Sequence, residues 1–325
     1  MEVIKRDGAK EGVKLDKIAA RIKKQMWGLN TEYVDYMSVV QKTVSGLHSG
    51  ITTTELDNLA AETAASMTAS HPDYSLLASR IALTRLYKQV PKTFSESIKL
   101  LFEAEFISDE VKAVVEKYAK KINSMIINDR DFNLDYFGFK TLERSYLLKA
   151  KNQIVETPQY MYMRVAVGIW HDDLENVQKT YDALSQGLFT HATPTLFNAG
   201  TRRSQLASCF LIGNKGDSIE GLFDTVKDVA QISKWAGGVG LHVHDVRAKG
   251  GFIKGTGGKS DGLVPMMKTY NEVARWINQG GKRKGSFAIY LEPWHADVYE
   301  FIELRKNHGV QRAKNKSLAL ISSLP

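Results

Sequence analysis

The apolar pattern changes character once along the chain, near residue 200, and this change limits the folds available to it. Before that point apolar residues recur at helical spacing, as after HPDY, where Tyr74, Leu77 and Ile81 fall on one face. After it come the short apolar and β-branched runs SCFLI, GVGLHVHDV and FAIYL, separated by helical segments such as 222–235. The sequence therefore predicts helical units first and an α/β layer or barrel afterwards.

Two helical units are expected before the change. Residues 1–92 begin with a predicted strand pair, EVIKRDG and EGVKL, followed by helices, of which the first is expected to run from a cap at Asp16 to Trp27. Residues 93–192 are predicted to form an all-helical second unit, and residues 193–325 to hold the α/β part.

Composition restricts the class of partner and the compartment. The chain has 44 Lys and Arg against 36 Asp and Glu, a net charge of +8, which favours anionic partners, although most of these cations are spread as on an ordinary solvated surface. No apolar run reaches the length of a membrane span and MEVIKRDG lacks a signal-peptide core, so we expect a cytoplasmic protein that binds neither membrane nor nucleic acid directly.

The chain contains one cysteine, Cys209. One thiol excludes an intrachain disulfide and a Cys-based zinc site built from this chain, and we identify no metal-ligating set in the sequence. A lone cysteine in an intracellular chain is most often a small buried apolar residue.

Two stretches carry residues suited to nucleotides. The first has four cations that can neutralise a triphosphate: Lys5, Arg6, Lys17 and Lys88. It also has Thr53 and Asp57, one helical turn apart, which can hydrogen-bond a sugar or a base. On spacing alone, ordinary surface charge is the commoner explanation of these residues.

In the second stretch, GDSIEGLF, Asp217 and Glu220 have the spacing of a capping box at a helix start that suits an anion, and Arg247 follows as a forked phosphate ligand. The alternative, favoured from these residues alone, is an ordinary capped helix and a glycine-rich turn. Ile253 occupies the position where a Walker A motif ending at Gly258-Lys259-Ser260 needs glycine, so that motif is excluded.

VIKRDG, followed by TTxELDxLAAE and HPDYxxLAxRI, closely resembles the ATP cone of the class I ribonucleotide reductase large subunit, of the eukaryotic and phage-like type. The resemblance covers about 310 residues and fades near QRAKNKSLALISSLP. It implies an overall activity site for ATP, as activator, and dATP, as inhibitor, formed by Lys5, Arg6, Glu11, Gly12, Val13, Lys14, Leu15, Asp16, Lys17, Thr53, Asp57 and Lys88.

Two further sites follow from the same resemblance. The stretch GDSIEGLF to GTGGKS is similar to the specificity site, with residues 249–258 as a flexible loop and Gln279 and Arg283 in a second loop that relays effector identity. TPTLFNAGTRRSQLASCFLI resembles the substrate segment, which makes Cys209 half of a redox pair and assigns Thr193 and Ser208 to the substrate diphosphate and ribose. The implied specificity residues are Asp217, Ser218, Ile219, Lys234, Arg247, Ile253, Lys254 and Gln279.

The fold that the family implies is α/β: a helical ATP cone, a helical domain, and the first half of a ten-stranded α/β barrel. The implied activity is reduction of ribonucleoside diphosphates to deoxyribonucleoside diphosphates for DNA synthesis, with ATP, dATP and dNTP effectors accompanied by Mg²⁺. The expected partners are a second copy in a dimer, a small subunit carrying a di-iron centre and tyrosyl radical, thioredoxin or glutaredoxin, and a chain with the missing C-terminal half.

The residues that form the thiyl radical and the second redox cysteine are expected beyond residue 325, so this chain alone is expected to be inactive. The alternative is a nucleotide-sensing regulatory or dimerisation module without reductase activity. A DNA-binding regulator is less consistent with the sequence, because no helix-turn-helix or zinc-finger pattern is present.

Overall fold

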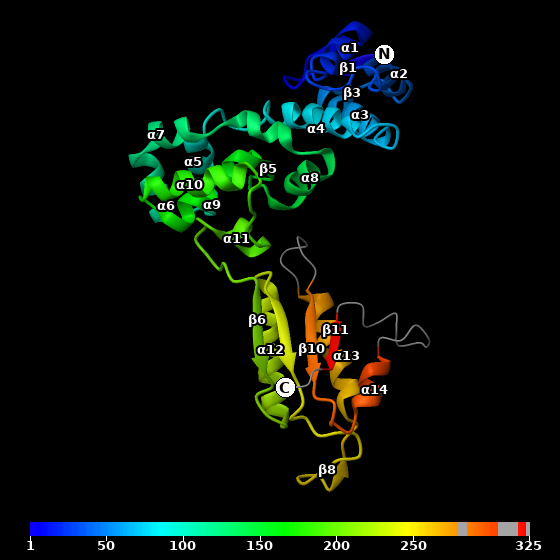
Figure 1. Ribbon diagram of the computed structural model, residues 1–325, viewed down its shortest axis with the longest axis vertical. Helices are drawn as coiled ribbons and strands as arrows, with labels where there is room; N and C mark the ends of the chain where they lie inside the picture. Colours follow the sequence, from blue (N-terminus) through cyan, green and yellow to red (C-terminus); the bar gives the residue numbers. More distant parts are fainter. Residues whose placement is uncertain (278–284, 305–317, 323–325) are drawn as a thin grey trace. The chain divides into compact units, whose positions relative to one another are not determined.

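The computed structural model describes residues 1–277, 285–304 and 318–322. The chain forms two compact units, one of Met1–His191 with Leu196–Ser204 and one of Ala192–Thr195 with Gln205–Pro325. The division falls where the apolar pattern changes, and Figure 1 shows helices throughout the first unit and a parallel sheet in the second. The expected α/β class, with helical units ahead of part of a barrel-like sheet, is confirmed.

The first unit starts with a three-stranded sheet in the order β2-β1-β3, in which β2 is antiparallel and β3 parallel to β1. Four helices follow or cover it, and α3 and α4 pack closely together. The elements are β1 Glu2–Ile4, β2 Lys10–Gly12, α1 Leu15–Lys23, α2 Tyr36–Ser45, β3 Ile51–Thr52, α3 Thr53–Ser66 and α4 Asp73–Leu86.

Local sequence explains where α3 and α4 begin and what they bury. Thr52 caps α3 in a reciprocal capping box with Glu55, which satisfies two otherwise unpaired N–H groups. In α4 the expected face is confirmed, because Tyr74, Leu77 and Ile81 are all buried in the core.

The expected boundaries of the first helix were wrong. Lys14, not Asp16, is the N-cap of α1, and Asp16 lies in the first turn. The helix ends at Lys23 rather than Trp27. An acidic residue in the first turn still complements the helix dipole, which explains why Asp16 looks like a cap in the sequence.

The remainder of the first unit is helical apart from one small hairpin, β4–β5, which the sequence did not reveal. Its core is separate from that around α4 and gathers around α9. The elements are α5 Phe94–Glu103, α6 Asp109–Lys117, α7 Ala119–Met125, the 3-10 helix η1 Asn128–Asn133, α8 Tyr136–Thr141, the π-helical turn η2 Leu142–Tyr146, β4 Lys149–Ala150, β5 Gln153–Ile154, α9 Pro158–Trp170 and α10 Leu174–Ser185.

Two buried polar clusters lie within this part of the chain. Arg164 on α9 pairs with Glu156 at 2.6 Å, with side chains 0% and 1% exposed. Asp131 on η1 accepts hydrogen bonds from the Tyr87 hydroxyl at 2.7 Å and from Gln159 Nε2 at 2.9 Å. Burial raises the pKa of Asp131 to about 7 despite these two donors.

The second unit is built on four parallel strands in the order β11-β10-β7-β6. Helices α12, α13 and α14 contribute buried side chains to the same core as β7 and β10, so they cover one face of the sheet. The helix α11 Thr193–Asn198 has residues in both units. The other elements of the second unit are β6 Cys209–Gly213, α12 Ile219–Lys234, β7 Gly238–His242, β8 Phe252–Ile253, β9 Gly258–Lys259, α13 Leu263–Trp276, β10 Phe287–Leu291, α14 Val298–Glu303 and β11 Leu318–Ser322.

Strand alternation separates the two faces of this sheet. Val239, Leu241 and Phe287 are buried beneath the helices. On the opposite face lie Cys209, which is exposed, and Leu211, which is 83% exposed. No helix among the described residues has both the length and the apolar character needed to cross a membrane.

Candidate nucleotide-binding sites

A cavity of about 760 Å³ lies in the N-terminal part of the first unit, between the strand pair and helices α1 and α3. Its walls combine apolar side chains with an excess of cations. The acidic lining residues are Asp7, Glu11 and Asp57, and the basic ones are Lys5, Arg6, Lys10, Lys14, Lys17, Arg21 and Lys88. A concave site with excess positive charge and an apolar floor suits a phosphorylated ligand that carries an aromatic base.

Glu11 on β2 holds one group of these cations. Lys5 Nζ lies 2.6 Å and Lys14 Nζ 3.7 Å from its carboxylate, and Lys17 donates a hydrogen bond to it. The bonds from Lys17 and then Lys5 lower the pKa of Glu11 to about 2. The carboxylate therefore stays ionised and keeps three lysines facing the cavity.

Asp57 on α3 holds a second group of cations and is only 9% exposed. Arg21 Nε donates to it at 3.0 Å, while Lys88 Nζ lies at 3.4 Å and Arg6 at 3.7 Å. Burial lowers the pKa of Lys88, and the charge of Asp57 acts in the opposite direction. Arg21 is fixed further by its hydrogen bond to Thr84 Oγ1 at 2.7 Å.

The cavity brings together most of the activity-site residues expected from the sequence. Leu15 and Asp16 do not line it; both are exposed in the first turn of α1. Helical periodicity explains the difference, because Lys14, Lys17 and Arg21 repeat on one face of α1 while positions 15 and 16 point elsewhere. The expected residues that do line the cavity are Lys5, Arg6, Glu11, Gly12, Val13, Lys14, Lys17, Thr53, Asp57 and Lys88.

Sequence reasoning missed Arg21, although its position four residues after Lys17 on an amphipathic helix was a usable signal.

The second expected site lies where β6 leads into α12. Arg247 Nε donates to Asp217 Oδ2 at 2.5 Å, and other guanidinium nitrogens donate to the carbonyl oxygens of Asp217 at 3.1 Å and Phe252 at 2.9 Å. The Arg247 side chain thus joins the start of α12 to the β8–β9 hairpin. Ile219, in the first turn of α12, is exposed.

The expected capping box of Asp217 and Glu220 was wrong. Ser218 is the N-cap, and its hydroxyl accepts a hydrogen bond from Gly221 N at 3.1 Å, because the Asp217 carboxylate is engaged by Arg247. The expected loop 249–258 includes most of an antiparallel hairpin, in which Ile253 lies on β8 and Lys254 in the exposed turn.

Lys234 lies at the opposite end of α12 from Ser218 and Ile219. It lies at the last residue of α12, about 22 Å along the helix axis from Ile219 at a rise of 1.5 Å per residue. Gln279 and Arg283 lie outside the described residues.

The expected substrate residues all belong to the second unit. Thr193 is the first residue of α11, and Cys209 begins β6, immediately after Ser208. The Ser208 carbonyl accepts a hydrogen bond from Gly238 N at 2.8 Å, which continues the β6–β7 pairing beyond the strand end. Cys209 therefore sits at the start of the edge strand, on the face that the helices leave uncovered.

Three family models match the chain in succession. The ATP cone domain matches residues 1–89, the ribonucleotide reductase all-alpha domain residues 132–204, and the ribonucleotide reductase barrel domain residues 207–323. The chain belongs to the ribonucleotide reductase large-subunit family. Similarity to this family continues to residue 323, so the expectation that it fades after about 310 residues was wrong.

Named relatives agree with these matches. The chain is 54% identical to a ribonucleoside-diphosphate reductase large subunit of Arabidopsis thaliana, 55% to one of Caenorhabditis elegans and 51% to one of Variola virus. These alignments cover 100%, 99% and 100% of the chain, but only 41%, 42% and 44% of the relatives. The chain thus spans about two fifths of the length of the ribonucleotide reductase subunits that it matches.

Proposed function

We propose that this chain supplies the effector-binding domains and the first barrel strands of a ribonucleoside-diphosphate reductase large subunit. The observation that carries the proposal is the cavity of the ATP cone, in which two carboxylates hold cations toward a space of nucleotide size. We infer three functional parts, residues 1–92, 93–192 and 193–325, in a cytoplasmic enzyme that makes deoxyribonucleotides for DNA synthesis.

In the ATP cone, ATP or dATP is the ligand that we propose. The triphosphate takes the place of Glu11 and Asp57 as the partner of the surrounding cations, so those cations need not be brought together when the ligand arrives. Charge-assisted bonds from Lys and Arg to phosphate are among the strongest hydrogen bonds in proteins. Leu56 and Ala60 on α3 provide an apolar wall for the base, and Mg²⁺ accompanies the triphosphate.

At the start of α12 we propose a dNTP specificity site built on Asp217, Ser218 and Arg247. The free N–H groups of the first helical turn and the guanidinium favour phosphate, and Asp217 can accept hydrogen bonds from a sugar hydroxyl. Since Lys234 lies at the far end of α12, one nucleotide can contact both ends only if two copies pair with their α12 helices antiparallel. Exposed Ile219 and Phe223 suit such a dimer interface.

In the complete enzyme Cys209 is proposed to reduce the substrate together with a second thiol, and Thr193 and Ser208 to position the diphosphate and ribose. The proposed partners are a small subunit with the di-iron centre and tyrosyl radical, thioredoxin or glutaredoxin, and a chain that carries the second redox cysteine.

Calorimetric titration tests the two effector sites. Purified chain is titrated with dATP in the presence of saturating dTTP, and separately with dTTP alone. We expect dATP to fill a site left open by dTTP, Lys88→Gln to weaken only the dATP site about tenfold or more, and Arg247→Gln to weaken only the dTTP site. Lys24→Gln, an exposed lysine just after α1, is the control. Absence of nucleotide binding, or equal effects of all three variants, would contradict the proposal.

A nucleotide-sensing module without reductase activity is the second candidate. It is favoured by the completeness of the cone cavity within residues 3–88 in a chain that holds one thiol. Mixing with a chain that carries the remaining reductase sequence and a small subunit separates the two functions, because only the reductase gains diphosphate reduction in the mixture.

A further inference from the structure

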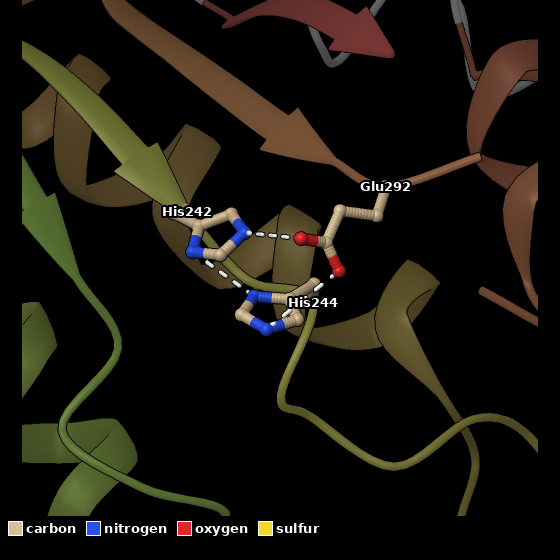
Figure 2. Close-up of side chains that lie close together, drawn as sticks. All are labelled: His242, His244 and Glu292. Carbon is tan, nitrogen blue, oxygen red and sulfur yellow. Dashed lines mark hydrogen bonds and ion pairs between the residues drawn. The ribbon is translucent and has the colours of Figure 1, made fainter. Parts of the chain in front are cut away.

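Two histidines and a glutamate meet at the carboxyl ends of two neighbouring strands. His242 is the last residue of β7, His244 lies two positions further, and Glu292 directly follows β10. Figure 2 shows the two imidazole rings and the carboxylate turned toward one another. One nitrogen or oxygen atom from each residue can be chosen so that all three lie within 4.8 Å of one another.

The parallel register of the sheet explains why these side chains converge. Tyr290 on β10 is paired with His242 on β7, and Val243 N donates to the Tyr290 carbonyl, so the pairing continues past the end of β7. Extending the register by two residues sets Glu292 beside His244. Residues two apart in a strand point to the same face, which brings His242 and His244 together while Val243 between them is buried.

We propose that His242, His244 and Glu292 form a binding site for a divalent transition-metal ion, of which Zn²⁺ is the best match. Two imidazoles and one carboxylate make a ligand set that zinc uses, with a fourth position left for water. The side chains are 40%, 39% and 21% exposed, so both an incoming ion and that water can reach them.

The spacing of the atoms fits a zinc ion bound between them. His242 Nε2 lies 3.7 Å from one Glu292 oxygen, and His244 Nε2 lies 3.6 Å from the other. Both separations are too long for a hydrogen bond. Ligand atoms about 2.0–2.1 Å from a tetrahedral zinc ion are about 3.4 Å from each other, which is close to the spacing found here.

Hydrogen bonding between the rings supports the same conclusion. The two Nδ1 atoms are 3.0 Å apart and the rings are stacked with centroids 3.7 Å apart. At most one Nδ1 can donate in this contact, and a neutral ring that donates from Nδ1 has an unprotonated Nε2, the nitrogen that lies toward Glu292. A metal ion binds such an unprotonated ring nitrogen.

The backbone that carries the ligands is held by a second set of contacts. His295 Nε2 bonds to the Val246 carbonyl at 2.8 Å, and Asp297 N donates to His295 Nδ1 at 3.1 Å, which identifies Nε2 as the donor. His295 thus joins the segment after Glu292 to the segment after His244. Such outer contacts are what keeps metal ligands oriented.

Cys209 is too far away to be a ligand. It pairs with Gly238 at the opposite end of the sheet, four residues before His242, or about 13 Å along the strand. The proposed ion therefore joins the ends of β7 and β10 without the thiol, as a clamp between two strands of the second unit.

Zinc titration of the complete 325-residue chain, freed of tags and of bound metal, tests this inference. We expect one equivalent of Zn²⁺ to bind, with affinity reduced at least tenfold by His244→Gln and by Glu292→Gln. His48→Gln, an exposed histidine in the other unit, and Cys209→Ser should leave binding unchanged. Unchanged affinity in both ligand variants, or no zinc binding by the unaltered chain, would overturn the proposal.

A second measurement needs no substitution and so does not depend on the variants folding. The ring signals of the eight histidines are followed by NMR during the zinc titration. We expect the signals of His242 and His244 to change first and together; if the signals of other histidines shift before these two, the proposal is overturned. Co²⁺ added instead of Zn²⁺ should produce the visible absorption of a tetrahedral site, and a spectrum of hydrated Co²⁺ alone would count against it.

Discussion

Glu11 and Asp57 between them arrange six of the cations around the cone cavity, three for each carboxylate. Removal of either acid should therefore lower the stability of the folded chain even without nucleotide. The two residues differ in burial: Asp57 is nearly inaccessible, whereas Glu11 is partly open to solvent. Their contributions to stability are consequently expected to differ in size and in dependence on pH.

The contribution of Glu11 to the unfolding free energy is expected to depend on pH. Its pKa is lowered from 4.5 to about 2 in the folded chain, so its ion pairs stabilise the fold fully above pH 4.5. That stabilisation is lost as the pH falls toward 2, because the native carboxylate is then protonated. Chemical unfolding of the chain and of Glu11→Gln between about pH 2 and pH 6 should show a difference that shrinks with falling pH. A constant difference would refute the role of these pairs.

At neutral pH we expect the loss of the Asp57 carboxylate to lower the unfolding free energy more than the loss of the Glu11 carboxylate. Asp57→Asn removes the charge of a nearly buried carboxylate that Arg6, Arg21 and Lys88 share. The expected loss in unfolding free energy is about 2–4 kcal/mol, since removing one member of a buried ion pair leaves the other charges without their partner. Thermal unfolding with Glu32→Gln, an exposed acid, as control provides the test. A loss no larger than that of Glu32→Gln would contradict it.

At the residue scale the sequence motifs predicted most of the cavity but not which carboxylate holds which cation. The motif supplies Lys5, Lys17 and Lys88, while the partner of each depends on the pairing of β1 with β2 and on the packing of α3 against α4. Asp217 shows the same limit. Its spacing from Glu220 suggests a cap, but Arg247, thirty residues away, competes successfully for its carboxylate.

Among the elements, α3 depends on its N-cap residue for both its start and its connection to the sheet. Thr52 belongs to β3 and also caps α3, so one residue ends a strand and begins a helix. Thr52→Ala removes the side-chain acceptor for Glu55 N and should lower the unfolding free energy by about 1 kcal/mol. Thr54→Ala is the matched control within the same turn, and an equal loss in both variants would argue against capping as the cause.

Asp131 connects η1 with α4 and α9 and gives these elements a pH-dependent contact. Its pKa is raised from 3.8 to about 7 by burial, so between these values the unfolded chain releases a proton that the folded chain keeps. Stability therefore falls as the pH rises from about 4 to about 7, by up to about 4 kcal/mol at roughly 1.36 kcal/mol per pKa unit. Asp131→Asn should flatten this part of the stability curve measured by urea unfolding. A curve with unchanged slope would show that other groups cause it.

Elements with a strong apolar pattern were predictable, and short ones were not. β6, β7 and β10 follow from SCFLI, GVGLHVHDV and FAIYL, because each is a run of apolar residues between turns. The two-residue strands β4 and β5 carry no such pattern. Their pairing results from the turn between them and from the helices packed around it, which local sequence does not encode.

For the whole molecule, the single thiol limits what the chain can do. Reduction of a substrate by a redox pair converts two thiols to a disulfide, and Cys209 is the chain's one cysteine. Purified chain, even with a small subunit and a thiol reductant, should therefore form no deoxyribonucleoside diphosphate. Product formation in that assay, absent from the Cys209→Ser control, would show that this single thiol suffices.

The His242–His244–Glu292 cluster shows the limit of sequence reasoning at this scale, since it becomes evident only from the register of β7 and β10.

The strand order of the second unit also has a consequence for its assembly. Along β6, β7, β10 and β11, each strand pairs with the one before it in the sheet, and a described helix lies in each interval between them. Every pairing step thus closes a loop of moderate length, which keeps the entropic cost of each step low. The four strands can therefore add to the sheet one after another in the order in which they are synthesised. Each newly paired strand offers its free backbone groups to the next strand that leaves the ribosome.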